Sequence, residues 1–122
     1  MAKAHSPRFL AMVNSAREEI NECMAPDLTK MIEEGAIIID VREQHEYDNQ
    51  HLDGALHIGK GVIERDIEKH AFSVSDKLVL YCGGGFRSAI AAKSLKEMGY
   101  ENVYSVWKGW RGILAEGLKT SE

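Results

Sequence analysis

The chain has 122 residues, which is enough for one domain and too few for two. Hydrophobic residues make up 44% of it and charged residues 28%, the balance of an ordinary globular protein. The net charge is -4, with acids and bases mixed along the chain, which excludes the basic character of a nucleic-acid-binding protein. No apolar run approaches the length of a membrane span. We therefore expect neither a nucleic-acid partner nor a membrane partner.

The sequence contains two cysteines, Cys23 and Cys82. Two cysteines do not make a disulfide framework, and residues this far apart do not have the spacing of metal ligands. Free thiols suit a reducing compartment, and Met1–Pro7 lacks the apolar core of a secretory signal. We expect a cytoplasmic protein without a metal site. Cys23, flanked by Glu22 and Met24, is expected to have a structural role in a short edge strand.

Helical signals open the chain. Ser6-Pro7 is typical of an N-cap followed by proline at the first helical position. Apolar residues then recur at helical spacing, which predicts an amphipathic helix over residues 7–20; they are Phe9, Leu10, Val13, Ala16 and Ile20. Such a helix can cover a core or make a dimer contact, so both a monomer and a homodimer are open. A second short helix is predicted over residues 28–32, and it ends at Gly35.

The rest of the chain alternates between short apolar runs and helical patterns. The run at 36–41 is rich in β-branched residues, as in a buried parallel strand. In chain order we predict a strand at 36–41, a helix at 43–49, a strand at 55–58, a helix at 62–70, a strand at 78–81, a helix at 89–99, a strand at 103–106 and a helix at 110–115. This alternation predicts an α/β fold in three layers, with a central, mostly parallel sheet of about five strands and helices on both faces.

Cys82 stands between a predicted strand and three consecutive glycines, Gly83, Gly84 and Gly85. In open α/β sheets ligands bind beyond the carboxyl ends of the strands, so topology alone places Cys82 at a site. Glycines allow positive φ and inward-facing amides, which form an anion-binding nest. A helix that starts near Arg87 adds its positive end. Together these features favour a thiolate at Cys82.

Phe86, Arg87 and Ser88 complete the segment. Arg87 is a fixed cation suited to an oxyanion, and Ser88 can cap the helix or donate to a bound group. A cysteine after an apolar strand is often only a small core residue, and glycines there can simply make a tight turn. The combination of strand, cysteine, glycines, arginine and helix instead favours a nucleophile that attacks an anionic substrate.

Four segments of the chain, taken in order, resemble the rhodanese (thiosulfate sulfurtransferase) family, specifically its single-domain members. They are residues 39–47 (Ile-Asp-Val-Arg-Glu, then Glu-Tyr), 51–58, 81–92 and 99–104, and the resemblance covers residues 22–118. It implies a rhodanese-like domain over residues 22–122, preceded by a helical extension over residues 1–21.

What the resemblance implies is sulfur transfer in two half-reactions. Cys82 would attack the sulfane sulfur of thiosulfate or a similar donor, sulfite would leave, and Cys82 would carry a persulfide. The acceptor would be cyanide, a small-molecule thiol or a protein thiol. No metal and no organic cofactor is implied.

The resemblance also assigns supporting roles. Arg87 and the backbone amides of residues 83–87 would hold the persulfide and the departing anion. Asp40 and Arg42, at a strand end near the loop, are expected to orient and brace it, or only to be a buried pair that fixes the strand end. One stretch departs from the family, which usually has two glycines and a later tryptophan near the C-terminus. Here Lys108 replaces the first glycine and Ile113 stands at the tryptophan position, which leaves the shape of the pocket rim open.

Two alternatives from other functional classes are open. Cysteine-dependent phosphatases and arsenate reductases have five residues between cysteine and arginine, whereas four separate Cys82 from Arg87 here. Position 88 is a serine, and Tyr81 stands where phosphatases commonly have histidine. The shorter loop favours transfer of a single sulfur atom. A non-catalytic rhodanese-like binding module is the other alternative, but such modules usually lose the cysteine.

Overall fold

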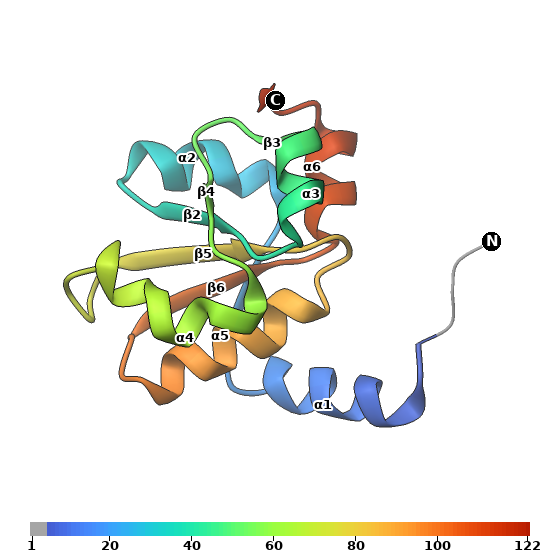
Figure 1. Cartoon of the computed structure of the whole chain (residues 1–122), viewed down its shortest axis with the longest axis vertical. Helices are drawn as coiled ribbons and strands as arrows, with labels where there is room; N and C mark the ends of the chain where they lie inside the picture. The colour runs from blue at the N-terminus through green and yellow to red at the C-terminus, as the bar shows by residue number, and fades with distance from the viewer. Residues whose placement is uncertain (1–4) are drawn as a thin grey trace.

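A five-stranded parallel sheet is the middle layer of the computed structural model, which describes residues 5–122 (Figure 1). Its strands, in spatial order, are β1 (Asn21–Cys23), β6 (Asn102–Val106), β5 (Lys77–Tyr81), β2 (Ile37–Asp40) and β4 (Leu56–His57). Each neighbouring pair is parallel. The predicted α/β fold is therefore confirmed, and Cys23 lies on an edge strand, as expected.

Helices cover both faces of the sheet. They are α1 (Pro7–Arg17), α2 (Leu28–Glu33), α3 (Gln44–Asn49), α4 (Ile63–Asp66), α5 (Arg87–Glu97) and α6 (Gly109–Glu116). In the view of Figure 1, α2, α3 and α6 lie above the sheet, and α4 and α5 lie below it. Helix α1 forms an additional row outside α5, against which it packs.

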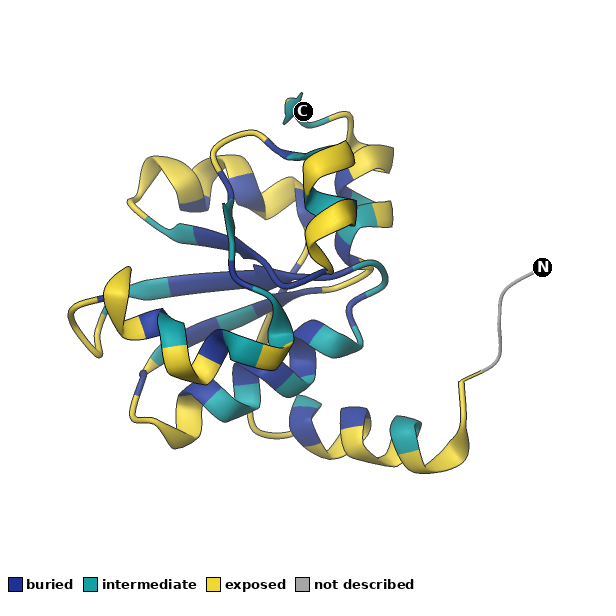
Figure 2. Cartoon of the chain, viewed as in Figure 1, coloured by how far each residue is buried: buried dark blue, intermediate teal, exposed yellow. Residues whose placement is uncertain are grey.

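The central strand β5 is buried on both sides. Successive side chains of a strand point to opposite faces. Leu78 and Leu80 join the core cluster that contains residues of α4 and α5, whereas Val79 and Tyr81 join the cluster that contains residues of α2 and α6. All four are fully buried, and most of β5 has the colour of buried residues in Figure 2. This two-sided burial explains why the predicted run is apolar without alternation.

The structure differs from the predicted elements in three places. Helix α1 ends at Arg17 rather than at residue 20, because Ile20 has left the helix to pack against the core. The predicted helix at 62–70 is the short helix α4 between two 3-10 turns, Lys60–Val62 and Ile67–Lys69. A small antiparallel pair, β3 (His51–Leu52) with β7 (Thr120–Ser121), was not predicted.

Helix α1 is attached to the rest of the fold by its inner face. Val13 and Ala16 are fully buried against Ala89 of α5. Ser6 occupies the N-cap without a side-chain hydrogen bond, and Pro7 is the first helical residue. The division into an extension over 1–21 and a domain over 22–122 stays a prediction, and residues 1–4 of that extension lie outside the described part. Within residues 5–122, no helix combines the length and the apolar character that a membrane crossing needs.

Candidate active site

The Cys82 sulfur is surrounded by the loop that links β5 to α5. Its Sγ accepts hydrogen bonds from the backbone N–H of Gly85 (3.1 Å) and of Ser88 (3.4 Å). Gly85 has φ +90°, and a Cβ on it would lie 3.0 Å from the carbonyl oxygen of Val106. A glycine is therefore needed for the loop to curl this tightly. The amides and the N-terminus of α5, at Arg87, place positive dipoles beside the sulfur, which stabilises negative charge there.

Two buried hydroxyl groups lie behind the sulfur. Ser88 Oγ is 3.5 Å from Cys82 Sγ and 2.7 Å from Ser105 Oγ. When the sulfur is ionised, Ser88 can donate to it while accepting a hydrogen bond from Ser105. Ser105 was not predicted as a site residue. The sequence does carry a sign of its role: Ser105 is a hydroxyl residue in a strand whose other residues include Val103 and Val106 of the core. A buried polar side chain of this kind needs a hydrogen-bond partner.

In front of Cys82 the surface is hollowed into a cavity of about 530 Å³. Predicted loop residues that line it are Cys82, Gly83, Gly84, Phe86 and Arg87. Gly85 and Ser88 instead hold the sulfur from behind. Further lining residues come from distant parts of the chain and were not predicted; they are His5, Phe9, Glu46 and Arg111. The fold brings these together from three segments that sequence spacing does not connect.

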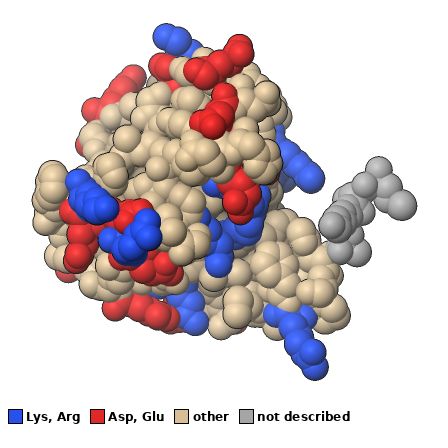
Figure 3. All heavy atoms as spheres, viewed as in Figure 1, with Lys and Arg blue, Asp and Glu red and all other residues tan. Residues whose placement is uncertain are grey.

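Arg87 lies in the wall of this cavity and is about one-third exposed, with its Nη2 3.8 Å from Glu46 Oε2. Solvent weakens an ion pair of this kind. Arg111 is a second cation of the lining. Figure 3 shows acidic and basic side chains interspersed over the visible face rather than one large field of a single sign. The arginines suit a small anionic group. Among the described residues, no three metal-ligating side chains gather into a site.

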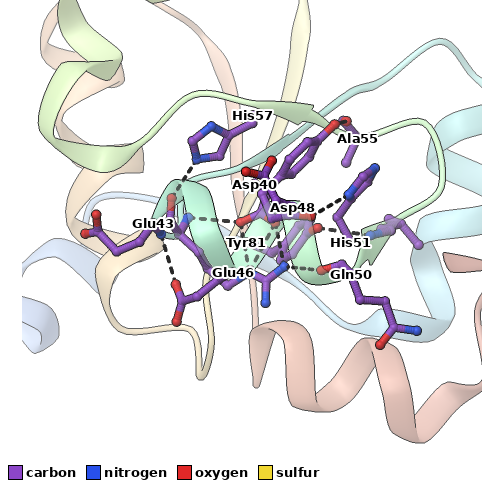
Figure 4. Close-up of polar contacts among 12 residues, drawn as sticks. Asp40, Glu43, Glu46, Asp48, Gln50, His51, Ala55, His57 and Tyr81 are labelled. Carbon is purple, nitrogen blue, oxygen red and sulfur yellow. Dashed lines mark hydrogen bonds and ion pairs between the residues drawn. The ribbon is translucent and has the colours of Figure 1, made fainter. Parts of the chain in front are cut away.

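Asp40 and Arg42 form a buried ion pair at the end of β2. Arg42 Nη2 lies 2.7 Å from Asp40 Oδ2, and Nε lies 3.0 and 3.1 Å from the two carboxylate oxygens. Arg42 also donates to the carbonyl oxygen of Gln50 (2.8 Å), which follows α3 (Figure 4). Burial lowers the pKa of Arg42, but the hydrogen bond and the charge of Asp40 raise it, and the net shift is upward. The guanidinium therefore stays charged.

The connection from this pair to the Cys82 loop is indirect. The Arg42 guanidinium lies over the ring of Trp110, 4.6 Å from its centre, and the backbone N–H of Trp110 donates to the carbonyl oxygen of Cys82 (2.7 Å). Within residues 5–122, neither Asp40 nor Arg42 makes a hydrogen bond to residues 82–88. The hydrogen bonds of the pair hold the end of β2 and the residue that follows α3, and the contact with the loop runs only through Trp110.

The family model for the rhodanese-like domain matches residues 24–116. The chain belongs to the rhodanese family. The thiosulfate sulfurtransferase GlpE of Coxiella burnetii is 34% identical over 77 residues, which cover 61% of this chain and 67% of GlpE. The tRNA uridine(34) hydroxylase of Erwinia tasmaniensis is 33% identical over 85 residues, which cover 61% of this chain and 22% of that protein. The chain thus spans only part of these relatives.

Solved structures share the rhodanese fold. The thiosulfate sulfurtransferase of Pseudomonas aeruginosa matches with a TM-score of 0.83 over 94% of this chain and 22% of that chain, at 19% identity. A protein of unknown function from Rhodopseudomonas palustris, described as a possible tyrosine phosphatase, matches with a TM-score of 0.81 over 99% of both chains, at 24% identity. At these identities the likeness concerns the fold alone.

The segment that departs from the rhodanese pattern packs against the Cys82 loop. Lys108 adopts the left-handed conformation, with φ 65°, which a glycine adopts without strain. Gly109 follows with φ +46°, and a Cβ on it would overlap the carbonyl oxygen of Cys82. Ile113 is fully buried in the core cluster between the sheet and α2. The altered segment therefore reaches the pocket through Arg111, whereas Ile113 belongs to the core.

Proposed function

We propose that this rhodanese domain is a sulfurtransferase in which Cys82 carries the transferred sulfur as a persulfide. The observation that supports this most is the position of the Cys82 sulfur. Cys82 lines a pocket, and its sulfur accepts hydrogen bonds from the backbone N–H groups of Gly85 and Ser88. A nucleophilic thiolate needs such stabilisation. A relative named for thiosulfate sulfur transfer supports the same chemistry.

In the first half-reaction the Cys82 thiolate attacks the outer sulfur of thiosulfate. A new S–S bond forms, the S–S bond of the donor breaks, and sulfite leaves with the bonding electron pair. Arg87 and Arg111 supply positive charge beside the departing anion, and Gly83 and Gly84 line the same cavity.

In the second half-reaction the acceptor attacks the terminal sulfur of the persulfide. The acceptor is cyanide, a small-molecule thiol or a protein thiol. The S–S bond of the persulfide breaks, and Cys82 leaves as a thiolate, ready for another donor. Ser88 stabilises that thiolate, and the Asp40–Arg42 pair supports the loop only indirectly, through Trp110. A thiol that must stay reduced between turnovers suits the cytoplasm.

The loop argues against the phosphatase alternative. Four residues separate Cys82 from Arg87. The N–H groups of Gly85 and Ser88 converge on the sulfur itself, so the bowl fits one added atom better than a tetrahedral phosphoryl group. Arg87 Nη2 lies 3.8 Å from Glu46 Oε2, so a carboxylate shares the lining with the cation that a phosphoryl group would need.

Intact-mass spectrometry before and after incubation with thiosulfate tests the proposal. The native protein should gain one sulfur atom, and cyanide should remove it with release of thiocyanate. The Cys23→Ser variant is the matched control and should gain the same sulfur, whereas Cys82→Ser should gain none. No gain in the native protein, or an equal gain in Cys82→Ser, would contradict the proposal. Turnover of an aryl phosphate without sulfur transfer would support the phosphatase.

A further inference from the structure

Three aromatic rings stand together along one side of the Cys82 pocket. Phe86 belongs to the catalytic loop, whereas His5 and Phe9 come from the start of the chain and from α1. The ring centres of His5 and Phe86 are 4.4 Å apart, those of His5 and Phe9 are 5.3 Å apart, and those of Phe9 and Phe86 are 6.3 Å apart. All three residues line the cavity. We call these three residues the aromatic wall.

Helix α1 is anchored so that its first turn stays beside the pocket. Val13 and Ala16 fix its inner face on α5. At its last residue, Arg17 donates to the carbonyl oxygen of Gly85 (3.3 Å). The Arg17 guanidinium also lies over the ring of Phe86, 5.1 Å from its centre. The helix is therefore tied both to α5 and to the loop that holds Cys82.

The size of the cavity exceeds what thiosulfate needs. A volume of about 530 Å³ lies within the range of sites that enclose whole organic molecules, on the order of 300–1,000 Å³. Thiosulfate is a small tetrahedral anion and has no group that an aromatic surface would bind. Aromatic side chains prefer to pack against other rings in stacked or edge-to-face arrangements.

The cavity lining also contains cationic side chains, which can bind a different part of a ligand from the aromatic wall. Arg87 and Arg111 can hold an anionic sulfur-bearing head, and Phe9 and Phe86 can hold an attached ring. We propose that α1 is part of the active site and that the aromatic wall binds the aromatic group of a sulfur donor larger than thiosulfate. This inference rests on the proposed sulfurtransferase function. An arylthiosulfonate has the required chemistry, an anionic sulfane sulfur on a sulfonyl group that carries a ring.

The step balances as it does for thiosulfate. The Cys82 thiolate attacks the terminal sulfur of the thiosulfonate, and the S–S bond of the donor breaks. The aryl sulfinate leaves with the electron pair, and Cys82 holds the persulfide. No oxidant or reductant is needed.

Matched donors test the role of the wall. The kcat/KM for benzenethiosulfonate should exceed that for methanethiosulfonate in the native protein. Phe9→Ala should lower the ratio of the two values about tenfold, because one ring contact is lost. Met12→Ala, on the exposed side of the same helix, should leave the ratio unchanged. Phe9→Leu keeps an apolar side chain if Phe9→Ala does not fold, and it should lower the ratio in the same direction. An unchanged ratio in a folded Phe9 variant overturns the proposal.

A binding measurement separates this inference from the proposed function. Benzenesulfonate cannot donate sulfur, so its binding to Cys82→Ser by calorimetry does not depend on turnover. It should bind more tightly than methanesulfonate, and Phe9→Ala should remove that preference. If the native protein transfers no sulfur from any donor but this preference is seen, the proposed function fails and the aromatic wall stands. Equal binding of the two sulfonates overturns the proposed role of the aromatic wall.

Discussion

Ser88 Oγ and Ser105 Oγ lie 2.7 Å apart, and the sulfur of Cys82 lies 3.5 Å from Ser88 Oγ. Both serines are fully buried, so water does not replace either partner. Ser105 comes from β6 and thus acts on Cys82 through Ser88. The hydroxyl pair joins the strand next to β5 to the sulfur of Cys82.

Ser105→Ala is expected to slow persulfide formation about fivefold. The loss corresponds to one hydrogen bond, about 1 kcal/mol, that orients the Ser88 hydroxyl. Stopped-flow measurement of a single turnover with thiosulfate checks this. In a Ser88→Ala background the same change should have little further effect, because the hydroxyl group that connects Ser105 to the sulfur is already absent. Additive losses in the double variant would show that Ser105 acts by another route.

Substitutions at Lys108 and Gly109 are expected to change the free energy of unfolding in opposite directions. Lys108→Gly should raise the free energy of unfolding by up to about 1 kcal/mol, because it relieves the left-handed conformation at φ 65° at some cost in unfolded-chain entropy. Gly109→Ala should lower it by about 2 kcal/mol or more, because its Cβ would overlap the carbonyl oxygen of Cys82. Urea unfolding measures both. Loss of stability in Lys108→Gly would mean that the lysine side chain makes a contribution that outweighs its strain.

Removing one partner of the Asp40–Arg42 pair should lower the free energy of unfolding more than removing both partners. Asp40 is fully buried, so Arg42→Met leaves a carboxylate without its partner and should cost about 3–5 kcal/mol of stability. The double variant Asp40→Asn with Arg42→Met should recover part of that loss. Chemical denaturation compares the two. A single variant with a loss below about 1 kcal/mol would contradict the prediction.

Cys23 should make stability fall at high pH. Burial, then the charges of Asp27 and Glu22, raise the pKa of its thiol from 9.0 to about 12. Between those values the unfolded chain loses the proton and the folded chain keeps it, so stability falls as pH rises. Urea titrations should show a shallower fall in Cys23→Ala than in the native protein. Equal slopes in the two proteins would contradict this.

The sheet and the Cys82 loop could be predicted from the sequence because their signals are local. The buried strands are continuous apolar runs, and the strand–cysteine–glycine–helix succession specifies both a turn and a site. The pair β3–β7 could not be predicted, because each strand is two residues long and its partner lies at the other end of the domain. The spacing of Ile63 and Ile67 predicts one helix over 62–70. The same spacing also fits a short α-helix flanked by 3-10 turns, so the sequence does not distinguish the two.

The site was predicted in part for the same reason. The residues of the loop are adjacent in the chain, whereas Phe9, Glu46 and Arg111 reach the pocket only through the fold. The helical spacing of α1 predicted an apolar face, but not that its first turn would pass the face of α5 and reach the pocket. Asp40 and Arg42 were recognised by position, but their connection to the loop through Trp110 is a tertiary contact.

The order of the strands has a consequence for synthesis of the protein. Strand β1 and α1 are synthesised before most of the domain, yet β1 pairs with β6 in the sheet and α1 docks on α5. Both partners belong to the last part of the domain to be made. Pairings over such sequence separations form slowly, and a domain completes them only when the whole of it is available. The residues that border the pocket on the α1 side are therefore translated before the rest of the domain and should take their places last.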